Sequence, residues 1–173
     1  PVQTTREGVY VTGIYQGPKD IPETVMQGSA VAGSAMALLG ESRGTEVTVK
    51  ELPPETDVAD AEARIGVFVC HCGINISQTI DVEAVAEMAK GEANVVYAEN
   101  MIYACAQDSQ EKIKALVKEQ KLNRVVVASC TPRTHEPLFQ ETIRDAGLNK
   151  YLFELADIRE QCSWCHMGEN EVA

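Results

Sequence analysis

From Arg64 onward, short apolar runs alternate with longer amphipathic segments. Such runs are typical of parallel strands, because a strand covered on both faces is apolar almost throughout. The amphipathic segments repeat their apolar residues at helical spacing, as Ile113, Leu116 and Val117 do among Lys and Glu. We predict strands at 65–69, 94–98, 124–128 and 151–155, and helices at 81–90, 109–120 and 137–146.

Strands that alternate with helices of this length predict an α/β fold. The sheet would be parallel and four-stranded, with flanking helices and right-handed crossovers, in outline flavodoxin-like or Rossmann-like. No Gly-x-Gly-x-x-Gly follows the first predicted strand, so the dinucleotide-binding fingerprint is absent there.

The first 63 residues have a different pattern. A short β-like run at 8–13 precedes an apolar stretch, rich in Ala, Gly and Ser, from Ile21 to Leu39. We predict a helix for this stretch, with Pro22 in its first turn. Residues 41–63 are acidic and polar without a long apolar period, which indicates a linker. The predicted α/β domain is then 64–173, and because the chain opens on Pro1 in what resembles the middle of a fold, we expect a fragment.

Charge and hydropathy exclude some classes of protein. A formal charge of −11 argues against a nucleic-acid partner, because phosphate contacts need a basic face. The acidity favours solubility, with an acidic docking face for a partner as the alternative. No apolar run approaches the roughly 20 residues of a membrane span, and no signal peptide opens the chain. We expect a cytoplasmic protein without a membrane span.

Cysteines are confined to the predicted α/β domain, and each follows a predicted strand. In an open α/β sheet, ligands bind outside the carboxyl ends of the strands. Four loops would therefore bring thiols to one edge of the sheet. With no secretory signal, metal or redox chemistry is favoured over a disulfide framework. The six residues are Cys70, Cys72, Cys105, Cys130, Cys162 and Cys165.

A [4Fe-4S] cluster needs four thiolates that converge on a small volume, and separate loops can supply them. Taking one cysteine from each loop gives Cys72, Cys105, Cys130 and Cys162 as the candidate ligands. Cys70 and Cys165 remain alternatives.

Three other interpretations stay open. A structural zinc site usually has paired Cys-x-x-Cys knuckles, and only Cys162 and Cys165 have that spacing. A thiol or persulfide enzyme would use Cys130 or Cys162 as its nucleophile, with Arg133 and His135 lowering the thiol pKa of Cys130. Buried, inert cysteine is the third interpretation.

Other polar residues neighbour the cysteines. His71, His135 and His166 could donate hydrogen bonds to sulfur, or contact only backbone and solvent. Arg133 is placed to offset the negative charge of a thiolate-bound cluster, or to pair with a nearby carboxylate. Trp164 is expected to shield the site from water.

Four segments carry a resemblance to a known family. Val-Cys-His-Cys-Gly-Ile-Asn at 69–75 and Ala-Ser-Cys-Thr-Pro-Arg-Thr-His-Glu-Pro at 128–137 resemble the A subunit of heterodisulfide reductase. The segments 147–153 and 157–164 strengthen the match. The resemblance implies the N-terminal domain of that protein, which holds a [4Fe-4S] cluster in an α/β setting. That family most often has Val at the position of Cys165, which argues against Cys165 as a ligand.

The segments 4–13 and 16–24 resemble another part of the same family, the end of its thioredoxin-reductase-like FAD domain. There a strand–loop–helix closes over the flavin, with the helix N-terminus directed at it. We expect residues 1–40 to be the C-terminal fragment of such a domain, so the 173-residue chain should not bind FAD well alone. The resemblance implies that eight residues approach FAD: Gly13, Gln16, Gly17, Pro18, Lys19, Asp20, Ile21 and Thr24.

The resemblance also implies a function and partners. In that family FAD bifurcates electron pairs, and clusters carry single electrons between a hydrogenase or formate dehydrogenase and the B and C subunits of heterodisulfide reductase. A flavin-domain end that precedes an N-terminal-type cluster domain suggests two copies fused head to tail. We expect an electron-transfer module that is not catalytic by itself, and a homodimer is one option for its assembly.

Overall fold

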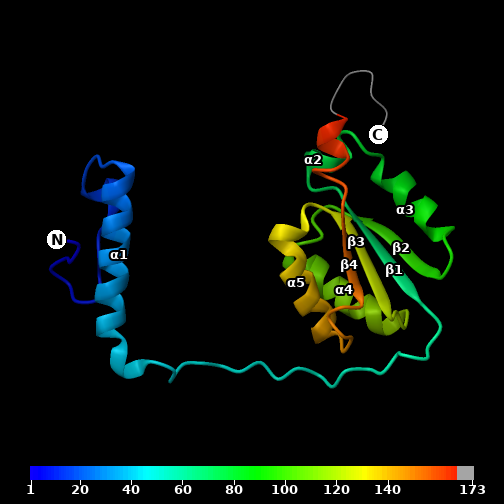
Figure 1. Cartoon of the computed structure of the whole chain (residues 1–173), viewed down its shortest axis with the longest axis horizontal. Coiled ribbons are helices and arrows are strands. Elements are labelled where there is room, and N and C mark those ends of the chain that lie inside the picture. The colour runs from blue at the N-terminus through cyan, green and yellow to red at the C-terminus, as the bar shows by residue number, and fades with distance from the viewer. Residues whose placement is uncertain (167–173) are drawn as a thin grey trace. The chain divides into compact units, whose positions relative to one another are not determined.

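The computed structural model describes residues 1–166, and the chain divides into two compact units, Pro1–Lys50 and a second that begins at Glu51 (Figure 1). Within the described residues, no helix combines the length and apolar character that a membrane crossing requires.

The second unit is an α/β domain around one four-stranded sheet, in the order β2-β1-β3-β4. All three strand pairs are parallel, which confirms the predicted fold class. The strands are β1 Ile65–Cys70, β2 Val95–Met101, β3 Arg124–Ser129 and β4 Phe153–Asp157. The helices are α2 Ile74–Ser77, α3 Val82–Lys90, α4 Gln107–Glu119 and α5 Pro132–Asp145, with a short 3-10 turn η3 at Ser163–Cys165.

Apolar side chains on the two faces of the sheet form two separate core clusters. Successive residues of a strand point to opposite faces, so Phe68 joins one cluster and Val69 the other. Residues of α4 and α5 complete the larger cluster, where the rings of Phe139 and Phe153 stack with centroids 5.6 Å apart. Residues of α2 and α3, including Ile76 and Ala86, complete the smaller one.

Several element boundaries in this unit differ from the prediction, and two of them have a clear local cause. Helix α5 begins at Pro132 and not at Pro137, because Thr131 caps it and Pro132 occupies its first turn. Pro137 lies inside the helix. Strand β4 begins at Phe153, two residues later than predicted. A turn precedes it, in which the main-chain N–H of Tyr151 donates to Asn149 Oδ1 at 3.0 Å.

The segment before β1 has no regular structure but is held against the rest of the second unit. Thr56 N donates to Gly147 O at 2.8 Å, and Arg144 Nη1 donates to Pro53 O at 2.6 Å. Asn149 Nδ2 donates to a Glu55 carboxylate oxygen at 2.9 Å. Part of the predicted linker therefore packs on the α/β domain and enters β1 in a fixed direction.

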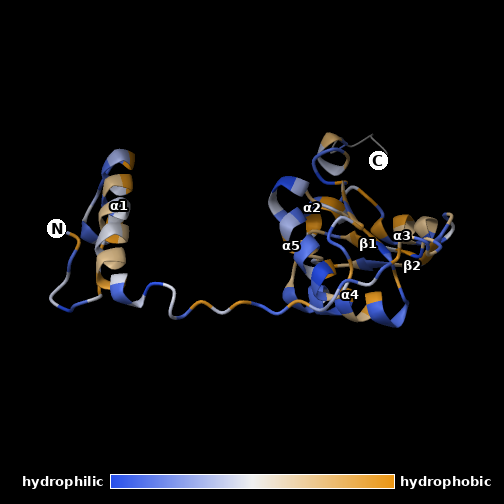
Figure 2. Cartoon of the chain, turned by 60° about the horizontal axis from the view of Figure 1, so that its bottom comes forward, coloured by the Kyte–Doolittle hydropathy of each residue, from blue (hydrophilic) through white to orange (hydrophobic). Residues whose placement is uncertain are grey.

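The first unit is built on helix α1, Ile21–Leu38, close to the predicted range. Asp20 accepts from Glu23 N, and the Glu23 carboxylate accepts from Asp20 N, which forms a capping box. The strand predicted at 8–13 is wrong: a single antiparallel bridge joins Gln3 and Tyr10, and the 3-10 helix η1, Gly13–Gln16, overlaps its end. No residue of α1 is buried, and apolar residues are spread along it (Figure 2).

Replacing Phe139 by alanine should strongly destabilise the second unit. Phe139 is 1% exposed and packs in the larger core cluster between α5 and the sheet, so the change leaves a cavity. We expect a loss of about 3–5 kcal/mol in the free energy of unfolding, measured by urea denaturation of the reduced, metal-free chain. The control Met88→Ala, at an exposed position of α3, should change it by less than about 0.5 kcal/mol. Equal losses for the two variants would contradict this description of the core.

Candidate functional site

The carboxyl edge of the sheet carries the cysteines, all of which are free thiols. Cys70 is the last residue of β1, Cys72 lies in the loop after it, and Cys130 directly follows β3. Cys105 lies between β2 and α4, and the remaining two, Cys162 and Cys165, follow β4. Because the strands are parallel, these loops leave the sheet at the same edge.

Cys70 is 4% exposed, and its sulfur accepts two main-chain hydrogen bonds. The donors are Cys72 N at 3.2 Å and Ala104 N at 3.3 Å. Burial raises the pKa of the Cys70 thiol, while the two N–H groups act to lower that pKa. The nearby sulfurs of Cys72 and Cys105 add to the rise. Cys72 and Cys105 are therefore near enough to Cys70 to affect the charge on its sulfur.

A sharp turn carries the chain from Cys70 to Cys72. Cys72 has a φ of 49° and Gly73 a φ of 59°, in the left-handed region. A side chain at Gly73 would come within 3.1 Å of the Tyr103 hydroxyl. His71 N donates to Met101 O at 2.8 Å. The turn is thus fixed to the loop after β2 that contains Cys105.

Cys130 is 6% exposed and lies near both Cys72 and Arg159. Burial raises the pKa of the Cys130 thiol, and the Cys72 sulfur contributes to the rise. The positive charge of Arg159 and the Ser129 hydroxyl act to lower that pKa. Burial has the largest effect, so the thiol form is favoured.

Cys162 and Cys165 follow β4 but lie in different surroundings. Cys162 is half-buried and packs on the smaller core cluster, which Cys72 also touches. Cys165 is exposed, and its thiol donates to Glu160 O at 3.2 Å. Cys105 is also exposed, although its sulfur is near enough to affect the pKa of the Cys70 thiol.

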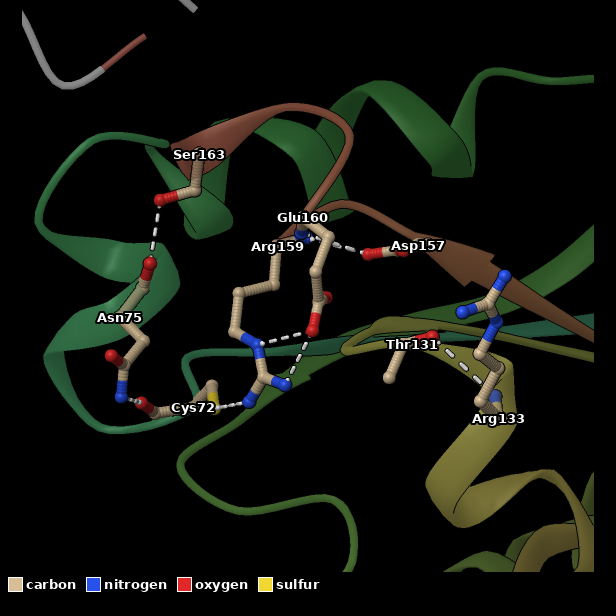
Figure 3. Close-up of polar contacts among 8 residues, drawn as sticks. All are labelled: Cys72, Asn75, Thr131, Arg133, Asp157, Arg159, Glu160 and Ser163. Atoms are coloured by element: carbon tan, nitrogen blue, oxygen red, sulfur yellow. Dashed lines mark hydrogen bonds and ion pairs between the residues drawn. The ribbon is translucent and has the colours of Figure 1, made fainter. Parts of the chain in front are cut away.

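Arg159 is the residue at this edge that sequence reasoning missed. Its Nη1 donates to Cys72 Sγ at 3.3 Å (Figure 3). Its guanidinium lies 4.8 Å from the centre of the Trp164 ring. Arg133 was expected in this role. It is exposed, and its main-chain N–H donates to Thr131 Oγ1 at 3.4 Å, while its guanidinium points away from Cys72 (Figure 3). The acidic residue beside Arg159, Glu160, was the available signal that this arginine would be held in place.

The histidines expected to donate to sulfur are half-buried in the loops at this edge. In residues 1–166, neither the His71 nor the His135 imidazole makes a hydrogen bond to a cysteine sulfur. His166 N donates to Ser163 O at 3.3 Å. The role predicted for these side chains stays a prediction.

Ligand spacing distinguishes a single metal ion from a cluster. Within the described part of the chain, no three His, Cys, Asp or Glu side chains are close enough together to hold one metal ion. A structural zinc ion requires four ligands at about 2.0–2.3 Å. A cluster of four irons is larger, so its four thiolates stand further apart. The described residues therefore offer no ready-made site for a single ion, and a cluster would draw its thiolates from several loops.

The residues expected to approach FAD lie around the start of α1. Gly13 and Gly17 have φ values of 64° and 123°, and Gln16 lies between them. Gln16 Nε2 donates to Val11 O at 2.6 Å and to Pro1 O at 2.9 Å, which fixes the loop. The remaining five lead into the first turn of the helix and are Pro18, Lys19, Asp20, Ile21 and Thr24.

The fold and the site define an α/β domain with a thiol-bearing sheet edge. Comparison with known proteins then shows which proteins the chain is similar to. The chain is 51% identical over 116 residues to a protein of Archaeoglobus profundus that is named as similar to the A subunit of heterodisulfide reductase, covering 67% of this chain and 16% of the relative. It is 53% identical over 112 residues to the second iron–sulfur A subunit of CoB–CoM heterodisulfide reductase from Methanopyrus kandleri. This match covers 65% of this chain and 17% of the relative. No protein-family model matches the chain.

A third relative is the A subunit of the H2:CoB–CoM heterodisulfide, ferredoxin reductase of Methanothermobacter thermautotrophicus, 51% identical over 112 residues, covering 65% of this chain and 17% of the relative. Over about two thirds of its length, this chain is homologous to the A subunit of heterodisulfide reductase. The suspected family is thereby confirmed. The chain spans about a sixth of the length of these curated relatives.

Alkylation should separate the buried from the exposed thiols. In the reduced, metal-free chain at a pH of about 8, we expect iodoacetamide to label Cys105 and Cys165 first, and Cys70 and Cys130 last. The latter two are buried and have raised pKa values, so fewer of their sulfurs are thiolates, and their labelling should need a higher pH than in the unfolded chain. Peptide mass spectrometry gives the order, with the guanidinium-unfolded chain as control. Early labelling of Cys130 would contradict the described burial.

Proposed function

We propose that this chain is an electron-transfer module of a protein similar to the A subunit of heterodisulfide reductase. In this proposal, the thiolates of Cys72, Cys105, Cys130 and Cys162 hold a [4Fe-4S] cluster at the carboxyl edge of the sheet, and Cys70 and Cys165 are the alternatives. When bound, the cluster supplies one-electron transfer. The observation that carries the proposal is the gathering of free thiols from several loops at one edge of a parallel sheet.

The chemistry of this edge suits a thiolate-bound cluster. Arg159 brings a positive charge to Cys72 Sγ in a chain whose net charge is −11. Main-chain N–H groups point at the sulfur of Cys70, the alternative ligand, as is usual around cluster sulfurs. Apolar residues of the smaller core cluster pack against Cys72 and Cys162 and limit the access of water.

A thiol enzyme with Cys130 as nucleophile fits less well. Such an enzyme needs an accessible sulfur with a lowered pKa. Cys130 is 6% exposed, and burial raises the pKa of its thiol. The arginine whose charge acts to lower that pKa is Arg159, and its effect is smaller than that of burial.

We extend the proposal to the parent protein by its relatives. The first unit would complete a FAD domain, with its eight loop and helix residues near the flavin once the rest of that domain is present. The B and C subunits, and a hydrogenase or formate dehydrogenase that delivers electrons, would be its partners in the cytoplasm. The names of the relatives, which include an iron–sulfur subunit and a ferredoxin reductase subunit, support this extension.

Anaerobic purification tests the proposal directly. We expect a brown protein with a broad absorption band near about 400 nm that bleaches on reduction, and about four irons and four sulfides per chain. A colourless, iron-free protein after anaerobic reconstitution would contradict it. Zinc at one ion per chain would favour the structural-metal alternative instead.

Single cysteine-to-serine variants test the ligand set. Cys72→Ser, Cys105→Ser, Cys130→Ser and Cys162→Ser should each lose most of the iron, because serine oxygen is a poor substitute for a thiolate at iron. Cys165→Ser is the matched control, since Cys165 is exposed and donates to a main-chain oxygen, and it should keep the iron. Iron retained by Cys105→Ser and lost by Cys70→Ser would replace Cys105 with Cys70 in the set.

A further inference from the structure

Arg159 is held by contacts on several sides at the cysteine-bearing edge. Its Nη2 and Nε donate to Glu160 Oε1 at 2.7 Å and 3.2 Å, and its Nη1 donates to Cys72 Sγ at 3.3 Å (Figure 3). The Trp164 ring lies against the guanidinium. The side chain is 20% exposed, so water reaches only part of it. A planar guanidinium with partners in these directions has little freedom to move.

The backbone that carries Arg159 is fixed to the sheet. Asp157, the last residue of β4, accepts from Arg159 N at 3.2 Å and from Glu160 N at 2.9 Å through Oδ1. Arg159 N and Ile158 N also lie at 3.2 Å and 2.9 Å from Ser129 O, at the end of β3. Ser129 directly precedes Cys130. The position of the arginine is therefore set by the same strand ends that set the cysteines.

The charge on Arg159 is permanent in the folded chain. Its hydrogen bonds to Glu160 raise its pKa, with the Cys72 sulfur adding to the rise, so it stays protonated at any pH at which the protein is folded. Charges act more strongly in such a half-buried place than in open water. Arg159 influences both Cys72 and Cys130, which belong to different loops.

We infer that Arg159 is a positioning residue that raises the reduction potential of the proposed cluster, and that Glu160 lowers that potential while it holds the arginine. This inference rests on the proposed function. Reduction adds one electron, and therefore one negative charge, to the cluster and its thiolates. A cation that donates a hydrogen bond to a ligating sulfur stabilises the reduced form, and a carboxylate close to the same site destabilises it.

Three variants of the full chain separate this effect from general charge effects. Arg159→Gln removes the cation and Glu160→Gln removes the anion. In Glu160→Gln the amide oxygen can still accept from the arginine, and the amide nitrogen takes the place of Glu160 Oε2, which is buried and without a partner in the described residues. Arg133→Gln is the matched control, since it removes the same charge at an exposed position of α5.

Midpoint potentials would be measured anaerobically by dithionite titration with dye mediators, with iron and sulfide assayed in each sample. We expect Arg159→Gln to make reduction of the cluster about tenfold less favourable, which is a fall of about 59 mV in the midpoint potential for one electron. We expect Glu160→Gln to raise the midpoint potential. Arg133→Gln should shift it much less than Arg159→Gln does. If Arg159→Gln does not retain the cluster, Glu160→Gln tests the inference alone: a higher midpoint potential supports it, and an equal or lower one overturns it.

The outcomes keep the two proposals apart. A wild-type chain that takes up no iron and sulfide would overturn the proposed function, and the inference with it. A wild-type chain that binds the cluster, with equal potentials for wild type, Arg159→Gln and Glu160→Gln, would overturn the inference alone. Equal downward shifts for Arg159→Gln and Arg133→Gln would also overturn it, since they would show only an effect of net charge.

Discussion

The parallel pairing of the four strands is the constraint on which the rest of the structure depends. The last residues of neighbouring strands stand side by side, as Cys70 does with Met101 and Ser129 does with Asp157. Helices on both faces return the chain to the opposite edge each time, so every loop that follows a strand leaves at one edge. Residues that are far apart in sequence, such as Cys72 and Cys130, become neighbours there without a local metal-binding motif.

The edge also combines buried sulfur with a fixed cation. Burial opposes the thiolate form at Cys70 and Cys130, so these sulfurs need a positive partner to ionise. Arg159 supplies one charge, and iron would supply more. Buried and half-buried cysteines, an ion pair and an aromatic ring therefore lie together in a chain that is otherwise strongly acidic.

The sequence was most informative where one physical effect dominates. The middle of a buried strand is apolar, as residues 125–128 of β3 are, so the positions of the strands and of the cysteines that follow them could be predicted. The start of α5 could not, since Pro132 and Pro137 both suit a first turn and only the Thr131 cap decides between them. Arg159 could not be predicted either, because it is far from Cys72 in sequence and only the end of β4 brings it to that sulfur.

The central claim is that one edge of the sheet holds the metal. Crystals of the anaerobically reconstituted chain, with anomalous diffraction collected on both sides of the iron absorption edge, would test it most directly. We predict a single compact iron peak at the carboxyl ends of β1 and β3, in contact with Cys72 and Cys130. Iron bound elsewhere, or no iron peak in crystals of a correctly folded chain, would contradict the claim.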